Sequence, residues 1–187
     1  MARMARPSAK SSSRDMLISM AVLLVPIVLI VWLFTDNPES DLEAVDVAPH
    51  LELAEEAGVF PILRAEQLPE PWKPVRVGWA EDGRMWIDNQ PSDGNAWMVG
   101  YLGPDDIYYG IEQRDRNVSQ VITRLTREGT KVDGTVDAAG WTWERYESDD
   151  GRTVSLVAQE GDMAAVVYAD SDFGALDAFV TSLTTGG

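Results

Sequence analysis

Few side chains in this sequence are suited to nucleophilic or metal chemistry. The 187 residues include no cysteine and one histidine, His50. Without thiols, disulfide scaffolds, zinc–thiolate sites and cysteine nucleophiles are excluded. His50 falls in a linker or at the start of a short helix, whereas a catalytic imidazole must be held rigidly in a pocket. Neither G-x-G-x-x-G nor a P-loop occurs. We therefore predict no catalytic, cofactor-binding or metal-binding residue.

Carboxylates are the one abundant source of reactive groups. A pair of carboxylates flanking a sugar bond would suit glycoside hydrolysis. Thirty acidic residues lie beyond residue 35, however, and the sequence alone does not show which two would form such a pair. Glu147, Asp149 and Asp150 together suggest a calcium site. Their spacing matches no EF-hand loop, however, and Asp150-Gly151 is typical of a tight hairpin. We interpret this cluster as a hairpin tip.

Tryptophans are the next notable group, and six of the seven lie beyond residue 35. Three alternate with apolar neighbours in predicted strands and are expected in the core: Trp97, Trp141 and Trp143. Trp79 and Trp86 instead flank the turn at Asp82-Gly83, beside acidic residues. Core packing is the favoured role for each of them taken singly, and together Trp79 and Trp86 form a candidate interaction surface.

An apolar run near the N-terminus separates these residues from the start of the chain. Leu17 to Phe34 are eighteen uncharged residues, of which Ser19 alone is clearly polar. As a helix the run would be about 27 Å long, close to the roughly 30 Å hydrocarbon core of a bilayer. Cleaved signal peptides have shorter apolar cores and a small-x-small cleavage site, which the following TDNPES lacks. We predict a retained signal-anchor, a single transmembrane helix over residues 16–34.

The charges around this run predict its orientation. The basic residues before it favour a cytoplasmic N-terminus: Arg3, Arg6, Lys10 and Arg14. We therefore expect a cytoplasmic tail over residues 1–15, an extracytoplasmic linker over 35–48 and a globular domain over 49–187. The predicted location is the cell membrane, with the globular domain on the outer side.

The globular part is strongly acidic. The first 35 residues hold four basic residues and one acidic residue, so the remainder holds eleven and thirty, a net charge of −19. Such a surface repels phosphate backbones and anionic lipids. We predict that the chain contacts the membrane through its N-terminal helix, binds an envelope protein, glycan or lipid, and does not bind nucleic acid.

Apolar periodicity predicts an α+β fold, a mainly antiparallel sheet with packed helices. Helices are expected over 49–58, 117–129 and 172–183. Strands are expected over 75–80, 84–88, 95–102, 107–113, 130–136, 141–148, 152–159 and 162–169. The last of these strands is apolar on both faces, which indicates a central position.

The start of the middle helix has two interpretations. Asn117-Val118-Ser119 matches the acceptor pattern for N-glycosylation. Asn117 also precedes a helical stripe, and Gln120 follows three positions later, as in a capping box. We predict that Asn117 caps the helix.

Several short motifs resemble the landmarks of an actinobacterial family, domain of unknown function 4245. They are RDM before the apolar run, FPIL (60–63), LPEPWKP (68–74), WMVGYL (97–102), YGIEQ (109–113), WTWERY (141–146) and FVTSL (179–183). The resemblance implies a single-pass membrane protein with an outer globular domain, and it implies no activity, cofactor or catalytic residue. The order of elements also resembles the Mog1/PsbP-like α/β/α sandwich.

Two functional classes remain open. The sequence favours a non-catalytic binding or interaction module of the cell envelope, because aromatic residues are in surplus and no catalytic pattern is evident. The alternative is a carboxylate-dependent hydrolase of envelope polymers.

Overall fold

The computed structural model of the chain describes residues 13–34, 42–66 and 68–186. The chain divides into two units, Met1–Leu42 and Glu43–Gly187. Most of the predicted tail and linker therefore lies outside the described residues, as do the side chains of residues 30–34 in the predicted anchor.

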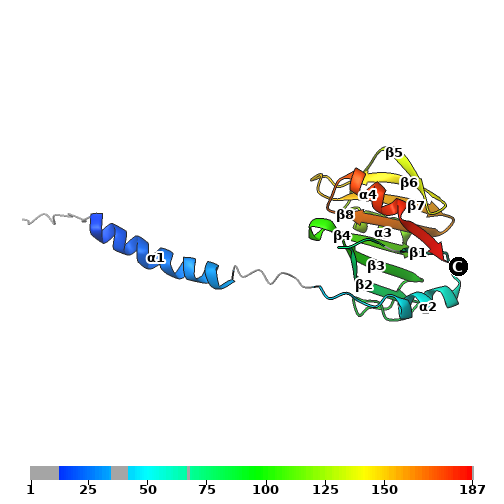
Figure 1. The fold of residues 1–187 in the computed structure, drawn as a ribbon, viewed down its shortest axis with the longest axis horizontal. Helices are drawn as coiled ribbons and strands as arrows, with labels where there is room; N and C mark the ends of the chain where they lie inside the picture. Colours follow the sequence, from blue (N-terminus) through cyan, green and yellow to red (C-terminus); the bar gives the residue numbers. More distant parts are fainter. Residues whose placement is uncertain (1–12, 35–41, 67, 187) are drawn as a thin grey trace, which may run out of the picture. The chain divides into compact units, whose positions relative to one another are not determined.

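The first unit contains the helix α1 (Ser13–Phe34), which spans the predicted apolar run and includes Pro26 (Figure 1). Its side chains from Met16 to Leu29 are all exposed. Among the residues that the structure describes, no helix is long and apolar enough to cross a membrane.

The second unit is built on an antiparallel sheet of seven strands in the order β2-β3-β4-β8-β7-β6-β5. These strands are β2 (Lys73–Ala80), β3 (Ala96–Leu102), β4 (Tyr108–Arg114), β5 (Thr130–Ala138), β6 (Trp141–Glu147), β7 (Val154–Glu160) and β8 (Met163–Ala169). The strand β8 is central, which confirms the prediction from its two apolar faces. A separate antiparallel pair joins β1 (Ile62–Ala65) to β9 (Leu183–Gly186).

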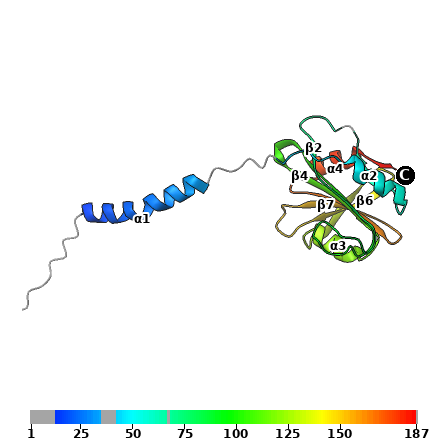
Figure 2. The same ribbon diagram turned by 90° about the horizontal axis from the view of Figure 1, so that it is seen from below.

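Helices cover both faces of this sheet, as Figure 2 shows. The helices α2 (Ala48–Ala57) and α4 (Phe173–Thr181) lie on one face with β1 and β9, and α3 (Val118–Leu125) lies on the other. The larger core cluster contains Ala54, Leu176 and Phe179, whereas Val121 and Leu125 of α3 belong to a smaller cluster. The predicted α+β class with a mainly antiparallel sheet is confirmed, and the layers are helix, sheet and helix.

Strand alternation places the predicted core tryptophans. Trp97 and Trp143 are fully buried, and Trp141 is partly buried against the same cluster. The hairpin tip is also confirmed, because Gly151 has a φ of 67° and the Asp150 carboxylate accepts hydrogen bonds from the Ser148 hydroxyl and the Arg152 N–H.

The predicted strand over residues 84–88 is wrong. Its segment forms only an isolated bridge between Met85 and Pro91. Because β2 pairs directly with β3, from Ala80 opposite Ala96, the residues between them are a closing loop. The Asp115 carboxylate fixes the end of this loop, because it accepts hydrogen bonds from both the backbone N–H and the side-chain amide of Asn95.

The prediction for Asn117 is confirmed in its position, because Asn117 is the N-cap residue of α3, but the expected side-chain cap is wrong. Asn117 adopts a left-handed conformation, with φ of 51°, and its side chain forms no cap hydrogen bond. Its amide instead donates to the Asp93 carboxylate of the β2–β3 loop. The helix ends at Leu125, earlier than predicted, because Arg127 and Glu128 adopt positive φ. The strand β9 was not predicted, since its residues follow the last helix with no alternating pattern.

Candidate functional site

The candidate site is a pocket of about 450 Å³ on the α4 side of the sheet, which we name the aromatic pocket. It lies between the loop Leu68–Trp72, the short 3₁₀ turn η1 (Pro104–Asp106), the start of β4 and the helix α4. These elements are distant in sequence, and the sheet brings them together. Ligand sites in proteins are typically concave spaces of this size lined mostly by apolar groups.

Three aromatic rings form one continuous group beside this pocket. The Trp72 indole stacks on the Phe179 ring with a centroid distance of 5.1 Å and an interplanar angle of 8°. The Tyr109 ring lies 4.7 Å from Trp72 and 5.0 Å from Phe179. Tyr109 and Phe179 are buried and Trp72 is partly buried, so the group extends from the core to the surface.

Contacts with the sheet hold the strand β1 and support the Trp72 ring. The Gln113 amide on β4 accepts from the Leu63 N–H at 2.7 Å and donates to the Pro61 carbonyl at 2.8 Å, which holds β1 against the sheet. Gly103 leaves room for the indole, because a Cβ there would lie 2.8 Å from the Trp72 ring. The Trp72 ring therefore lies between Gly103 and its stacking partner Phe179.

The rim of the aromatic pocket carries two carboxylates. Asp172 is the N-cap of α4, and its carboxylate accepts from the Ala175 N–H at 3.0 Å. Asp105 of η1 has a φ of 57°. Both side chains are exposed, and no lysine or arginine lines the pocket among the described residues. The pocket therefore combines an apolar interior with a negative rim.

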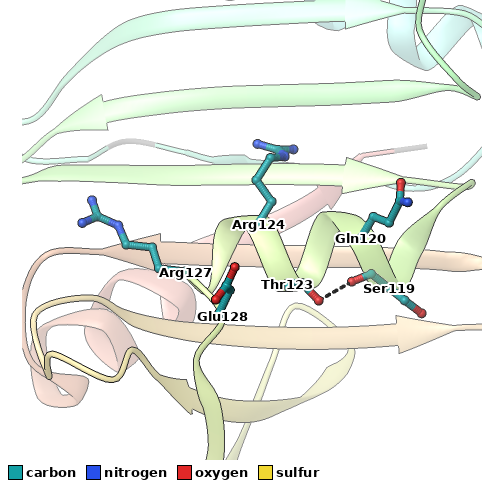
Figure 3. Close-up of a pocket in the computed structure, with 6 residues that line it drawn as sticks. All are labelled: Ser119, Gln120, Thr123, Arg124, Arg127 and Glu128. Carbon is teal, nitrogen blue, oxygen red and sulfur yellow. Dashed lines mark hydrogen bonds between the residues drawn. The ribbon is translucent and has the colours of Figure 1, made fainter.

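A second, shallower depression runs along the outer surface of α3 (Figure 3). Arg124 and Gln120 leave the helix on one side and Ser119 and Thr123 on the other. The Arg124 guanidinium binds the Glu112 carboxylate at 2.8 Å, and Arg127 binds Asp170 at 3.3 Å. Because these arginines are already paired within the protein, the depression is a weaker candidate than the aromatic pocket.

The two tryptophans of the predicted interaction surface lie on opposite faces of the sheet. Trp79 packs edge-on against Phe60 at 5.9 Å, beside the larger core. The next residue along the strand, Gly78, faces the other side of the sheet, where Trp86 and Ile87 of the loop cover it. Trp86 lies under the Arg114 guanidinium, 4.4 Å from the ring centroid. Both are partly buried, so they do not form one patch, and a role in binding for either stays a prediction.

Two partly buried tyrosines, Tyr108 and Tyr168, line a smaller pocket on the α3 side. Tyr108 and Tyr168 cover adjacent glycines, since a Cβ on Gly100 would meet the Tyr108 hydroxyl at 2.1 Å and one on Gly110 would meet the Tyr168 ring at 2.3 Å. Burial raises the pKa of both phenols above the ordinary value near 10. Both hydroxyls are therefore neutral at physiological pH, which suits packing rather than proton transfer.

His50, the single histidine, lies on α2, and its Nδ1 is buried without a hydrogen-bond partner. In the part of the chain that the structure describes, no group of three or more histidine, aspartate or glutamate side chains could hold a metal ion.

Sequence reasoning did not identify the residues of the aromatic pocket. Trp72, Tyr109 and Phe179 come from three separate segments, and no spacing rule links them. Two features of the sequence pointed to this region only indirectly. They are the proline-rich segment LPEPWKP, which cannot join the middle of a sheet, and the turn at Gly103-Pro104-Asp105.

One comparison with known proteins assigns the chain to a family. The model of the family described as Protein of unknown function (DUF4245) matches residues 9–183. Comparisons with curated proteins and with solved structures found no significant match.

Proposed function

The chain belongs to the DUF4245 family of proteins of unknown function, and from that premise we propose that it is a non-catalytic binding module of the cell envelope. The aromatic pocket is the observation that carries this proposal. Its three rings and its volume suit the apolar part of a ligand, and burial of an aromatic or aliphatic group there supplies binding energy in proportion to the area removed from water. Because the Trp72 ring is already stacked on Phe179, little ordering of this ring is needed on binding.

We further propose that residues 16–34 anchor the domain in the membrane, with residues 35–187 outside the cell. Support comes from the uncharged run in the sequence, which continues through residues 30–34 beyond the side chains that the structure describes. Its basic N-terminal flank and the exposed apolar side chains of α1, such as Leu23 at 69%, add to this support. The actinobacterial setting rests on the motif resemblance, and the helix–sheet–helix layering supports the proposed likeness to Mog1/PsbP-like sandwiches.

A carboxylate-dependent hydrolase is the second candidate, because Asp105 and Asp172 line the same pocket. Glycoside hydrolysis at neutral pH requires one carboxyl group to stay protonated, and burial in an apolar site usually provides this. Both side chains are exposed, and Asp172 is engaged as a helix cap. The geometry therefore favours binding over hydrolysis.

The binding proposal predicts that a small apolar alcohol occupies the aromatic pocket. The full chain is labelled with 5-fluorotryptophan, and 4-phenylbutanol is titrated while the Trp72 resonance, assigned with Trp72→Phe, is followed by ¹⁹F NMR. We expect a saturable shift. Ala178→Phe, which fills the pocket from an exposed position on α4, should weaken binding by about tenfold or more.

Ser119→Phe is the matched control, since it makes a comparable change at an exposed position on α3. It should leave the affinity within about twofold, and both variants should keep the parent melting temperature. No saturable shift, or equal binding by the parent and Ala178→Phe, would show that the pocket does not take apolar ligands.

The anchor proposal predicts a single crossing with the domain outside. Cysteines are introduced one at a time at Ser12 and at the exposed Asp149, which is simple because the chain has none of its own. On intact cells an impermeant maleimide should label only the second variant, since the first lies on the cytoplasmic side. Equal labelling, or a mature N-terminus near Asp36, contradicts the anchor.

A further inference from the structure

We propose that the ligand of the aromatic pocket is an organic cation, an ammonium group on an apolar stem. This inference rests on the proposed function, because it assigns a ligand class to the same pocket. The apolar stem would lie against the Trp72, Tyr109 and Phe179 group, and the ammonium group would lie at the rim.

Charge at the rim is the first argument. Asp105 and Asp172 both line the pocket, and no lysine or arginine does so among the described residues. The arginines of neighbouring elements are occupied elsewhere: Arg127 binds Asp170, and Arg145 binds Asp177 on α4. A ligand at this rim therefore meets two carboxylates, with no lysine or arginine among the pocket residues that the structure describes.

The aromatic lining is the second argument, and it is independent of the carboxylates. An ammonium group at the rim would lie nearest to Trp72, because Trp72 is the partly exposed ring of the group, and tryptophan rings attract such cations. Beyond residue 35 the chain also carries a net charge of −19, so its long-range field draws cations and repels anions.

The dipole of α4 favours a ligand of the opposite, negative charge. The positive end of the α4 dipole, at the N-terminus of that helix, faces this region and would attract an anion. Asp172 already occupies that end, because its carboxylate accepts from the Ala175 N–H and its carbonyl accepts from the Leu176 N–H. The protein's own carboxylate thus takes the place of an anionic ligand and leaves the rim negative.

The test compares three probes that share one stem: 4-phenylbutylamine, 4-phenylbutanol and 4-phenylbutyrate. They are titrated into the full chain in zwitterionic lipid nanodiscs, with empty nanodiscs as a blank, and the Trp72 ¹⁹F resonance reports binding. We expect the amine to bind about five- to tenfold more tightly than the alcohol, and the butyrate to bind most weakly. Added salt should weaken only the amine.

The double variant Asp105→Asn/Asp172→Asn isolates the rim charge. Asparagine tolerates positive φ at position 105 and remains a good N-cap at position 172, so the backbone should be unchanged. In this variant the amine should bind no more tightly than the alcohol, whose affinity should stay within about twofold. Asp133→Asn/Asp162→Asn removes the same charge from residues outside the pocket and should preserve the preference.

Each other outcome overturns the inference in a distinguishable way. Equal affinities for all three probes, blocked by Ala178→Phe, would retain the apolar pocket and reject the cation. Tightest binding of 4-phenylbutyrate would show that the helix dipole dominates. Binding of none of the probes would overturn the proposed function itself.

Discussion

Replacing Leu176 with aspartate should abolish cooperative folding of the globular unit. The Leu176 side chain is 0% exposed, in the middle of α4 and within the larger core cluster. A carboxylate there would lie among the apolar side chains of that cluster and must either be buried or expel α4 from the sheet. Either result costs several kcal/mol, and the whole stability of a domain is only about 5–15 kcal/mol. Thermal unfolding followed by near-UV circular dichroism measures the effect.

Leu53→Asp provides the matched control, because it makes the same chemical change on α2, where Leu53 is 56% exposed. This variant should stay within about 1 kcal/mol of the parent. If Leu176→Asp melts as Leu53→Asp does, α4 does not pack on the sheet as described, and the aromatic pocket beneath it is not formed.

Local patterns were sufficient to predict the sheet and its core. Alternation in a strand depends only on the backbone, so Trp143 could be assigned to the core and Thr142 to the surface before any partner strand was known. The two apolar faces of β8 likewise required cover on both sides, and the helices supply it. These features follow from nearest neighbours in the chain.

The errors arose where a tertiary contact replaced a local preference. Asn117 has the residue type of a helix cap, but its amide binds Asp93, so its backbone adopts a left-handed turn. Residues 84–88 have the composition of a strand, but Trp86 lies under Arg114 and the β2–β3 pairing leaves that segment in a loop. In both cases the deciding partner lies outside the sequence window that the pattern used.

The candidate site was beyond prediction for a related reason. A ligand pocket needs groups that converge in space, and Trp72, Tyr109 and Phe179 converge only because β4 and α4 are brought together by the central strand β8. Trp79 and Trp86 were grouped because they are close in sequence, yet the turn between them places them on opposite sides of the sheet. Spacing along the chain does not determine convergence across a sheet.

We expect a second large loss of stability from a change in the buried ion cluster on the α3 face of the sheet. The Glu112 carboxylate is 3% exposed and accepts from Arg114 Nε and Arg124 Nη2, each at 2.8 Å. Arg114 is itself buried, donates to the Ser92 hydroxyl at 3.2 Å and covers Trp86. Glu112 thus neutralises the cation that holds the β2–β3 loop against the sheet.

Glu112→Ala should therefore lower the free energy of unfolding by about 3–5 kcal/mol, because it leaves the Arg114 charge buried without a counterion. Urea denaturation of the variant and the parent measures the difference. Glu144→Ala is the control: Glu144 lies in the same row across the sheet and binds Lys131 at 2.6 Å, but its side chain is 42% exposed. Its loss should cost less than about 1 kcal/mol.

A double variant separates the unpaired charge from the lost contacts. Glu112→Leu/Arg114→Leu removes both buried charges and leaves Arg124, whose side chain is 57% exposed, in contact with water. Buried ion pairs replaced by apolar residues often cost little stability, so the double variant should recover more than half of what Glu112→Ala loses. If the double variant is as unstable as Glu112→Ala, the packing of the cluster rather than its charge balance holds this face of the sheet together.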